Sequence, residues 1–179
     1  MTLSGRVDLI QHLYNDGDFY MKVLIISDTH GHNDVMWEVL KREEPVDMVI
    51  HCGDLETPYD YIRERINATF HAVAGNNDYD SKLERISTFN IGKYKALLTH
   101  GHRNHVYSDL SSLYYLGAEN QADFVFFGHI HVPVLQQEGP VTLVNPGSLT
   151  YPRQQGRVPT YMVMTVGEKG KPEIELKYV

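Results

Sequence analysis

The sequence predicts an α/β fold in which two packed mixed β-sheets are flanked by helices. In the first part of the chain, short apolar runs rich in β-branched and aromatic residues recur, and helical patterns separate the early ones. Such runs suit strands buried on both faces, and strand-helix-strand order implies right-handed crossovers and a largely parallel sheet. After His131, apolar or alternating segments between Gly and Pro turns indicate an antiparallel group. Two sheets with helices outside them form a four-layer αββα sandwich.

The elements follow from the pattern in chain order. The runs that predict the first strands are 23–26, 48–50, 70–74, 96–98 and 124–127. Asn33 is expected to cap a helix with an apolar face that ends before Pro45, because Asn is a favoured cap and Pro stops a helix. Thr57-Pro58 opens a second helix through Ile66, since proline suits a first turn. A third helix is expected at 109–119, and the antiparallel strands at 132–136, 141–144, 161–166 and 173–178.

Composition narrows the class of protein. The 179 residues suffice for one domain, and 42% hydrophobic with 22% charged residues is ordinary globular usage. The net charge of -7 argues against binding to a nucleic-acid backbone, which needs a basic face. It leaves phosphate substrates possible, because bound cations supply positive charge locally. The single cysteine, Cys52, fits a reducing cytoplasm, and no apolar run approaches the ~18 residues of a membrane span.

The first twenty residues are treated separately from a single domain at 21–179. They lack the apolar stretch and cleavage site of a secretory signal, and Met21 stands directly before the first strong strand. Two interpretations remain open. Residues 1–20 are either an upstream leader, with the natural start at Met21, or an N-terminal surface extension with a short helix near Leu9 to Tyr14. The intact mass of the natural protein would separate them.

Side chains able to bind metals follow five of the apolar runs. They are Asp28 and His30, Asp54, Asn76, His100, and finally His129 and His131. In open α/β sheets, ligands bind outside the carboxyl ends of the strands. A lone histidine or Gly-Asp pair is usually structural, but five coincident strand ends favour a site. Glycines that permit close approach lie beside most of them, at Gly31, Gly53, Gly75, Gly101 and Gly128.

The chemistry of this ligand set suits two transition-metal ions. Two carboxylates, one amide and four imidazoles fit Mn, Fe, Zn, Ni or Co, whereas Ca and Mg prefer oxygen ligands. Seven ligands exceed the needs of one tetrahedral zinc. A shared carboxylate can hold two cations ~3.5–4 Å apart, which is the spacing of two-metal hydrolases.

The motifs also carry a family resemblance over residues 21–179. They are Asp28-x-His30, Gly53-Asp54, Gly75-Asn76, His100 after a strand, and Gly128-His129-x-His131. In this order they resemble the calcineurin-like metallophosphoesterase superfamily, which implies a metallo-dependent phosphatase-like fold. The small size and the segment Asn145-Pro146-Gly147-Ser148 resemble its compact YfcE-like phosphodiesterase branch. From physics alone, that segment is either a turn facing the site or an ordinary Pro-Gly turn.

The resemblance implies a division of the ligands between two metals. Asp28, His30 and His131 would hold one cation, Asn76, His100 and His129 the other, and Asp54 would bridge them. A hydroxide between the metals would attack phosphorus, so no protein nucleophile is needed. The expected activity is that of a dinuclear phosphodiesterase acting on a small phosphodiester. Manganese is the expected metal, with nickel, zinc, iron or cobalt as alternatives.

Two further residues are candidates for catalysis. Many members of the superfamily have histidine directly after the ligand Asn, but this chain has Asn77, which has no titratable proton. Because acid catalysis contributes ~10²–10⁴ in rate, we predict better turnover of activated diesters than of alkyl phosphate esters. His102 could contact the substrate phosphate or replace the missing acid, or it is a solvated loop histidine. Asp78 is expected to orient the neighbouring loop.

Other functions remain as alternatives to the phosphodiesterase. One is a phosphomonoesterase with the same metals, and another is a non-catalytic protein-binding scaffold of the retromer-subunit type. The intact ligand set favours the enzyme over the scaffold, because none of the seven residues is replaced. The expected partner is a small phosphoester substrate, with neither nucleic acid nor membrane, and a homo-oligomer is possible.

Overall fold

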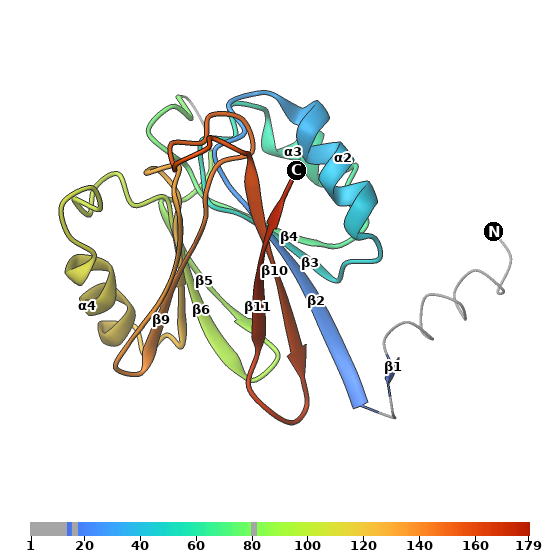
Figure 1. Ribbon diagram of the computed structural model, residues 1–179, viewed down its shortest axis with the longest axis vertical. Coiled ribbons are helices and arrows are strands. Elements are labelled where there is room, and N and C mark those ends of the chain that lie inside the picture. Colours follow the sequence, from blue (N-terminus) through green and yellow to red (C-terminus); the bar gives the residue numbers. More distant parts are fainter. Residues whose placement is uncertain (1–13, 16–17, 80–81) are drawn as a thin grey trace, which may run out of the picture.

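Two β-sheets pack face to face in the computed structural model, which describes residues 14–15, 18–79 and 82–179 (Figure 1). The first sheet has the order β11-β10-β2-β3-β4, and β1 pairs with β2. Its strands are β1 (Tyr14–Asn15), β2 (Asp18–Ile26), β3 (Met48–His51), β4 (Thr69–Ala72), β10 (Thr160–Gly167) and β11 (Glu173–Tyr178). The second has the order β5-β6-β7-β9-β8. Its strands are β5 (Ile86–Ile91), β6 (Tyr94–Thr99), β7 (Phe124–Phe126), β8 (Pro133–Glu138) and β9 (Val141–Pro146).

Helices cover the outer face of each sheet. Helices α2 (Asn33–Glu43) and α3 (Tyr59–Arg63) lie against the first sheet, and α4 (Ser111–Glu119) lies against the second (Figure 1). The layers are therefore helix, sheet, sheet, helix, and the predicted αββα sandwich is confirmed. Within the described ranges, no helix has the length and apolar character that crossing a membrane requires.

Alternating side chains of the strands build the core. In β2, Val23 and Ile25 point between the sheets, whereas Leu24 and Ile26 pack in the cluster beneath α2. Both faces of the strand are covered, which explains why the sequence reads as an uninterrupted apolar run. Burying each such side chain contributes about 1.5–3 kcal/mol, so this packing fixes the strand ends in place.

A buried ionic cluster joins α2 to the first sheet. The Glu43 carboxylate accepts a hydrogen bond of 2.8 Å from the Tyr161 hydroxyl and pairs with Lys22 at 2.8 Å and Lys177 at 3.2 Å. Burial raises the pKa of Glu43, but the contacts with Lys22, Tyr161 and Lys177 outweigh it and leave the pKa below its usual value. The carboxylate is therefore ionised at neutral pH and contributes to folding.

Several predicted elements differ from the structure. Strand β5 was not predicted; it is an edge strand of mixed exposure and lacks the apolar run of its neighbours. The expected antiparallel group divides between the sheets, because β8 and β9 pair in the second while β10 and β11 pair in the first.

The helix boundaries need correction as well. Helix α3 ends at Arg63 and does not reach Ile66. Asn33 is the first residue of α2 and His32 precedes the helix, so the predicted cap is wrong by one position; the Asn33 side-chain amide donates to Thr57 Oγ1 at 2.9 Å.

The N-terminal prediction is only partly within the described residues. Positions 9–13 of the short helix expected near Leu9 to Tyr14 lie outside them. Tyr14 pairs with Phe19 in the register of β1 and β2. Strand β2 begins at Asp18 and continues through Met21, which pairs with Val166 of β10.

Candidate metal centre

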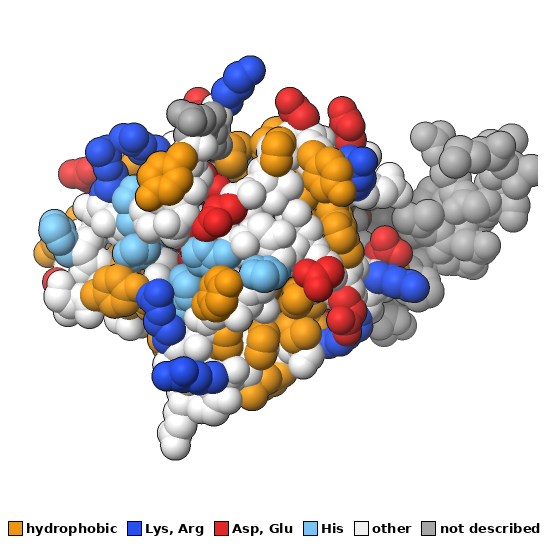
Figure 2. Space-filling view, turned by 90° about the horizontal axis from the view of Figure 1, so that it is seen from above, with side chains coloured by type: hydrophobic (Ala, Val, Ile, Leu, Met, Phe, Trp, Pro, Cys, Tyr) orange, Lys and Arg blue, Asp and Glu red, His pale blue; other side chains and the backbone are white. Residues whose placement is uncertain are grey.

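The predicted ligands meet where parallel strands of both sheets end. Asp28, His30, Asp54 and Asn76 follow β2, β3 and β4 of the first sheet, and His100, His129 and His131 follow β6 and β7 of the second. Parallel pairing of β2 with β3, of β3 with β4 and of β6 with β7 brings these ends to one edge of each sheet. Figure 2 shows the result as a gathering of histidine side chains near the middle of one face. The site therefore draws on both sheets.

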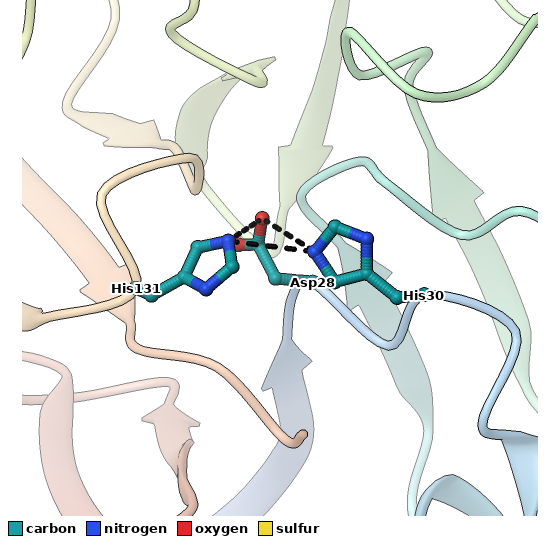
Figure 3. A group of neighbouring side chains, drawn as sticks. All are labelled: Asp28, His30 and His131. Carbon is teal, nitrogen blue, oxygen red and sulfur yellow. Dashed lines mark hydrogen bonds and ion pairs between the residues drawn. The ribbon is translucent and has the colours of Figure 1, made fainter. Parts of the chain in front are cut away.

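Asp28 lies at the centre of the first group (Figure 3). Its Oδ1 atom is 3.0 Å from His131 Nε2 and 3.9 Å from His30 Nε2. Asp28 also belongs to a second group with Asp54 and His100, and the ligand atoms of each group all lie within 4.8 Å of one another. The two groups therefore share one carboxylate, that of Asp28.

The remaining predicted ligands border the second group. Asp54 Oδ2 is 3.5 Å from His100 Nε2 and 3.8 Å from His30 Nε2. The side-chain oxygen Oδ1 of Asn76 lies 3.2 Å from His100 Nε2. The His129 ring stands edge-on to the His100 ring, with 5.1 Å between the ring centroids. Contacts thus connect all seven side chains.

Hydrogen bonds fix the orientation of three imidazoles. The Nδ1 atoms of His100 and His131 lie 2.7 Å from the carbonyl oxygens of Cys52 and Tyr151, and Nδ1 of His30 lies 2.6 Å from the Glu56 carboxylate. A carbonyl oxygen only accepts hydrogen bonds, so Nδ1 of His100 and of His131 carries a proton and the Nε2 atom of each ring is turned toward the centre. Such second partners are typical of histidines that bind metals.

These orientations leave electron-rich atoms facing one another. The Nε2 atoms of His30 and His131 are 3.4 Å apart, and Asp28 Oδ1 is buried without a hydrogen-bond partner in the described part of the chain. These two imidazole nitrogens and the carboxylate oxygen lie within 4.8 Å of one another, close enough for one cation to contact all three. The donor set therefore fits a divalent metal ion of the type that binds nitrogen and oxygen.

The charge states agree with this fit. Burial raises the pKa of Asp54, but the contacts with His100 and Asn77 outweigh it and leave the pKa well below its usual value. The pKa of Asp28 is also lowered, because contacts with His131 and His100 outweigh burial. Burial and the neighbouring His100 lower the pKa of His129 to about 4, so its ring is neutral at pH 7. Ionised carboxylates and a neutral imidazole are the forms that bind metals.

The backbone is strained at the same residues. Five of the seven predicted ligands have positive φ: Asp28 at 54°, His30 at 47°, Asp54 at 53°, His129 at 69° and His131 at 57°. A non-glycine residue in this region costs about 1–3 kcal/mol and persists only where its surroundings enforce it. Backbone bonds from Asp28 to Gly53 at 3.1 Å and from His30 to Asp54 at 3.0 Å provide part of that support.

Two glycines are required by close approach. A Cβ atom at Gly75 would lie 2.0 Å from Asp54 Oδ1, and one at Gly128 would lie 2.1 Å from Ser27 Oγ and 2.8 Å from Asp28 Oδ2. Both distances are far below contact, so neither position accepts a side chain without displacing a predicted ligand.

The two candidate catalytic residues lie beside the centre. The Asn77 backbone and side-chain amides donate to the Asp54 carboxylate at 2.8 and 2.7 Å. The side chain of Asn77 is thus engaged with a predicted ligand. The His102 ring lies 5.5 Å from that of His100, and its Nδ1 atom is buried without a partner in the described ranges. Burial and the charge of His100 lower the pKa of His102, so this ring is neutral at pH 7.

Neighbouring segments hold the ligand loops in place. The Asp78 carboxylate accepts backbone hydrogen bonds from Gly75 at 2.8 Å and Glu56 at 2.7 Å, in the orienting position expected of it. In the segment 145–148, the Asn145 amide donates to the Gly128 carbonyl at 2.8 Å and the Ser148 hydroxyl donates to the Asp28 carbonyl at 2.9 Å. This turn therefore supports the site and is more than a surface loop.

Sequence reasoning missed four residues at the rim of the centre. Glu56 contacts His30, Tyr151 contacts His131 through its carbonyl, and Tyr107 and Arg153 contact the carbonyl of His129. Glu56 follows Asp54 by two positions, which is the one local signal that could have drawn attention to it. Tyr107, Tyr151 and Arg153 stand in loops, where spacing carries no pattern.

A cleft of about 780 Å³ adjoins the centre. Glu56 and Asn77, which contact the predicted ligands His30 and Asp54, belong to its walls together with Tyr59, His71 and Tyr79. The cleft thus borders residues that contact two predicted ligands, and aromatic side chains form part of its lining.

Comparison with known proteins agrees with the geometry. Residues 21–169 match the calcineurin-like phosphoesterase superfamily domain. A probable metallophosphoesterase of Mycoplasma genitalium is 35% identical over 161 residues, which cover 88% of this chain and 95% of that protein. Phosphodiesterase YfcE of Escherichia coli is 28% identical over 74% of this chain and 82% of its own length.

Solved structures share the fold. A predicted phosphoesterase from Streptococcus pneumoniae has a TM-score of 0.79 at 28% identity, covering 89% of this chain and 90% of that one. Vps29 of Entamoeba histolytica has a TM-score of 0.70 at 24% identity over 89% of this chain and 99% of its own, a likeness of fold alone. By its domain match and its relatives, this chain belongs to the calcineurin-like phosphoesterase superfamily, in the compact YfcE-like branch.

Proposed function

We propose that this protein is a dinuclear metal-dependent phosphodiesterase that hydrolyses small phosphodiesters. The observation that carries the proposal is the convergence of two ionised carboxylates with imidazoles whose Nδ1 atoms are already engaged. Two divalent cations bound there would lower the pKa of water and offset the charge on phosphoryl oxygens. Manganese is the proposed metal, and nickel, zinc, iron and cobalt suit the same donors.

The proposed ligand assignment follows the contacts. Asp28, His30 and His131 would hold one cation, and Asn76, His100 and His129 would hold the other. Asp54 would bridge them, since its Oδ2 atom is within 4 Å of His30 and of His100, one residue from each set. Asp28 Oδ1 also lies within 4 Å of both histidines, at 3.9 Å from His30 Nε2 and 3.9 Å from His100 Nε2. Either carboxylate is therefore a candidate for the bridging ligand.

Two features favour a diester over a monoester as substrate. A diester carries a second organic group, and the adjoining cleft of about 780 Å³ offers space for one. The position after Asn76 is Asn77, whose amide supplies no proton to a poor leaving group. Relatives named phosphodiesterase agree with this preference.

The test uses metal-free protein reloaded with Mn²⁺. We expect hydrolysis of bis(p-nitrophenyl) phosphate to exceed that of p-nitrophenyl phosphate, and Asp54→Asn to abolish both. Bound metal is measured in Asp54→Asn and in Asp28→Asn. The bridging carboxylate is the one whose replacement releases both ions. Full metal loading without hydrolysis of either compound would refute the enzyme. A partner protein retained by both the native chain and Asp54→Asn would then support a scaffold.

A further inference from the structure

One arginine is attached to both histidines that follow β7. The backbone N–H of Arg153 donates to the carbonyl of His131 at 2.9 Å, and its guanidinium Nη1 donates to the carbonyl of His129 at 3.4 Å. The side chain is exposed, so its charge faces the solvent at the rim of the candidate metal centre. Figure 2 shows basic side chains beside the gathered histidines on this face.

Tyr107 contacts both the guanidinium of Arg153 and the carbonyl of His129. Its ring lies edge-on to His129, with 5.0 Å between centroids, and its hydroxyl donates to the His129 carbonyl at 3.1 Å. The hydroxyl oxygen also accepts a hydrogen bond from Nη1 of Arg153. The three groups are therefore linked by three hydrogen bonds: Arg153 donates to the Tyr107 hydroxyl and to the His129 carbonyl, and the Tyr107 hydroxyl donates to the same carbonyl.

These hydrogen bonds engage one edge of the guanidinium and leave another available. Nη1 makes both side-chain contacts, whereas Nη2 and Nε have no partner in the described part of the chain. Those two nitrogens present parallel N–H groups that match two oxygens of a phosphate. Fixing a flexible arginine in advance reduces the entropy lost when an anion binds.

We propose that Arg153, positioned by Tyr107, binds a non-bridging oxygen of the substrate phosphoryl group, a contact that rests on the proposed phosphoesterase function. The group recognised is a phosphoryl oxyanion, and the guanidinium adds a third positive contact beside the two cations. The alternative is that Arg153 only fastens its loop to the His129 carbonyl.

The test measures phosphate binding directly and independently of turnover. Inorganic phosphate is titrated calorimetrically into Mn²⁺-loaded native protein and the Arg153→Gln, Arg153→Lys and Tyr107→Phe variants, with bound metal and melting temperature recorded for each. Arg157→Gln is the matched control, because Arg157 is exposed on the same loop and its backbone N–H donates to the carbonyl of Gln154, away from the predicted ligands.

We expect Arg153→Gln to weaken phosphate binding about 10- to 100-fold with unchanged metal content, as the loss of a charged hydrogen-bonding pair predicts. Arg153→Lys should lose less phosphate affinity, because it keeps the positive charge but not the two parallel N–H groups. Tyr107→Phe should lose about threefold in phosphate affinity, because the guanidinium is no longer fixed by the Tyr107 hydroxyl. The control should match the native protein.

Three results would overturn the contact. The first is an unchanged phosphate affinity in Arg153→Gln with both metals bound. The second is no phosphate binding by the native protein. The third is a loss of bound metal or a lowered melting temperature in both Arg153→Gln and Arg153→Lys, which indicates that Arg153 only holds its loop in place. Phosphate binding that depends on Arg153 in a protein that hydrolyses no ester would instead leave this contact standing and refute the proposed function.

Discussion

Replacing Glu56 tests whether His30 is a metal ligand held in place by a carboxylate. Glu56 Oε1 lies 2.6 Å from His30 Nδ1, and Glu56 lies in the loop that Asp78 fixes through a 2.7 Å backbone hydrogen bond. Glu56→Gln keeps an acceptor for the Nδ1 proton but removes the negative charge. Glu56→Ala removes both, so the two variants separate orientation from charge.

The expected loss of metal affinity depends on how far solvent screens the contact between Glu56 and His30. Loss of such a second partner costs 10- to 100-fold in metal affinity, or about 1.4 to 2.8 kcal/mol. The Glu56 side chain is 34% exposed and His30 is 13% exposed, so solvent screens the pair in part. We therefore expect about 10-fold weaker binding of one Mn²⁺ ion in Glu56→Ala and a smaller loss in Glu56→Gln.

Calorimetric titration of metal-stripped protein with Mn²⁺ measures both sites at once. Only the site that contains His30 should weaken, and the site that contains His100 should keep its affinity, because its Nδ1 atom bonds to a backbone carbonyl. Glu84→Gln, at the far wall of the same cleft, serves as the charge control. Native affinity at both sites in Glu56→Ala would refute the reasoning that links Glu56 to a metal-bound His30.

Three further outcomes are expected. Asn77→His should lower the ratio of bis(p-nitrophenyl) phosphate to alkyl phosphate monoester turnover severalfold, because imidazole can donate a proton to the poor alkoxide leaving group; an unaltered ratio contradicts this. Gly128→Ala should destabilise the protein by about 1–3 kcal/mol in urea denaturation and weaken Mn²⁺ binding, since its Cβ would lie 2.8 Å from Asp28 Oδ2. Tyr161→Phe should cost about 1.5 kcal/mol at pH 7, the low end for a hydrogen bond to a charged group, because two lysines still contact Glu43. Because the folded pKa of Glu43 is lowered, that difference should be complete above roughly pH 4.3 and shrink as pH falls through the folded pKa; a difference constant down to pH 2 would refute the assignment.

The sandwich was predictable from the sequence because its buried strands are uninterrupted apolar runs. The segment Val23-Leu24-Ile25-Ile26 is apolar on both faces, and the structure buries all four residues between a helix layer and the second sheet. The edge strand β5 has no such run, and only its pairing with β6 makes it a strand. Edges depend on partners far along the chain, which a local pattern does not contain.

The ligand-type residues of the candidate site were predictable from the sequence, but the loop residues around them were not. Ligand-type residues stand directly after predicted strands, so sheet topology alone brings them together. The left-handed backbone of Asp28 and His131 leaves no trace in residue type, because φ there is set by neighbouring loops. Glu56 and Arg153 act through loops whose course depends on tertiary packing, and for that reason the sequence did not single them out.

The origin of the predicted ligands in two different sheets links metal content to the integrity of the whole sandwich. Asp54 follows the first sheet and His100 follows the second, yet their side-chain atoms are 3.5 Å apart. Cations bound by both residues would have to be released on unfolding, and the folded state would gain about 2.7 kcal/mol for each ion at a concentration 100 times its dissociation constant. A chelator would then lower the melting temperature of the protein as well as removing its reactive centre, so thermal stability becomes a reporter of metal supply.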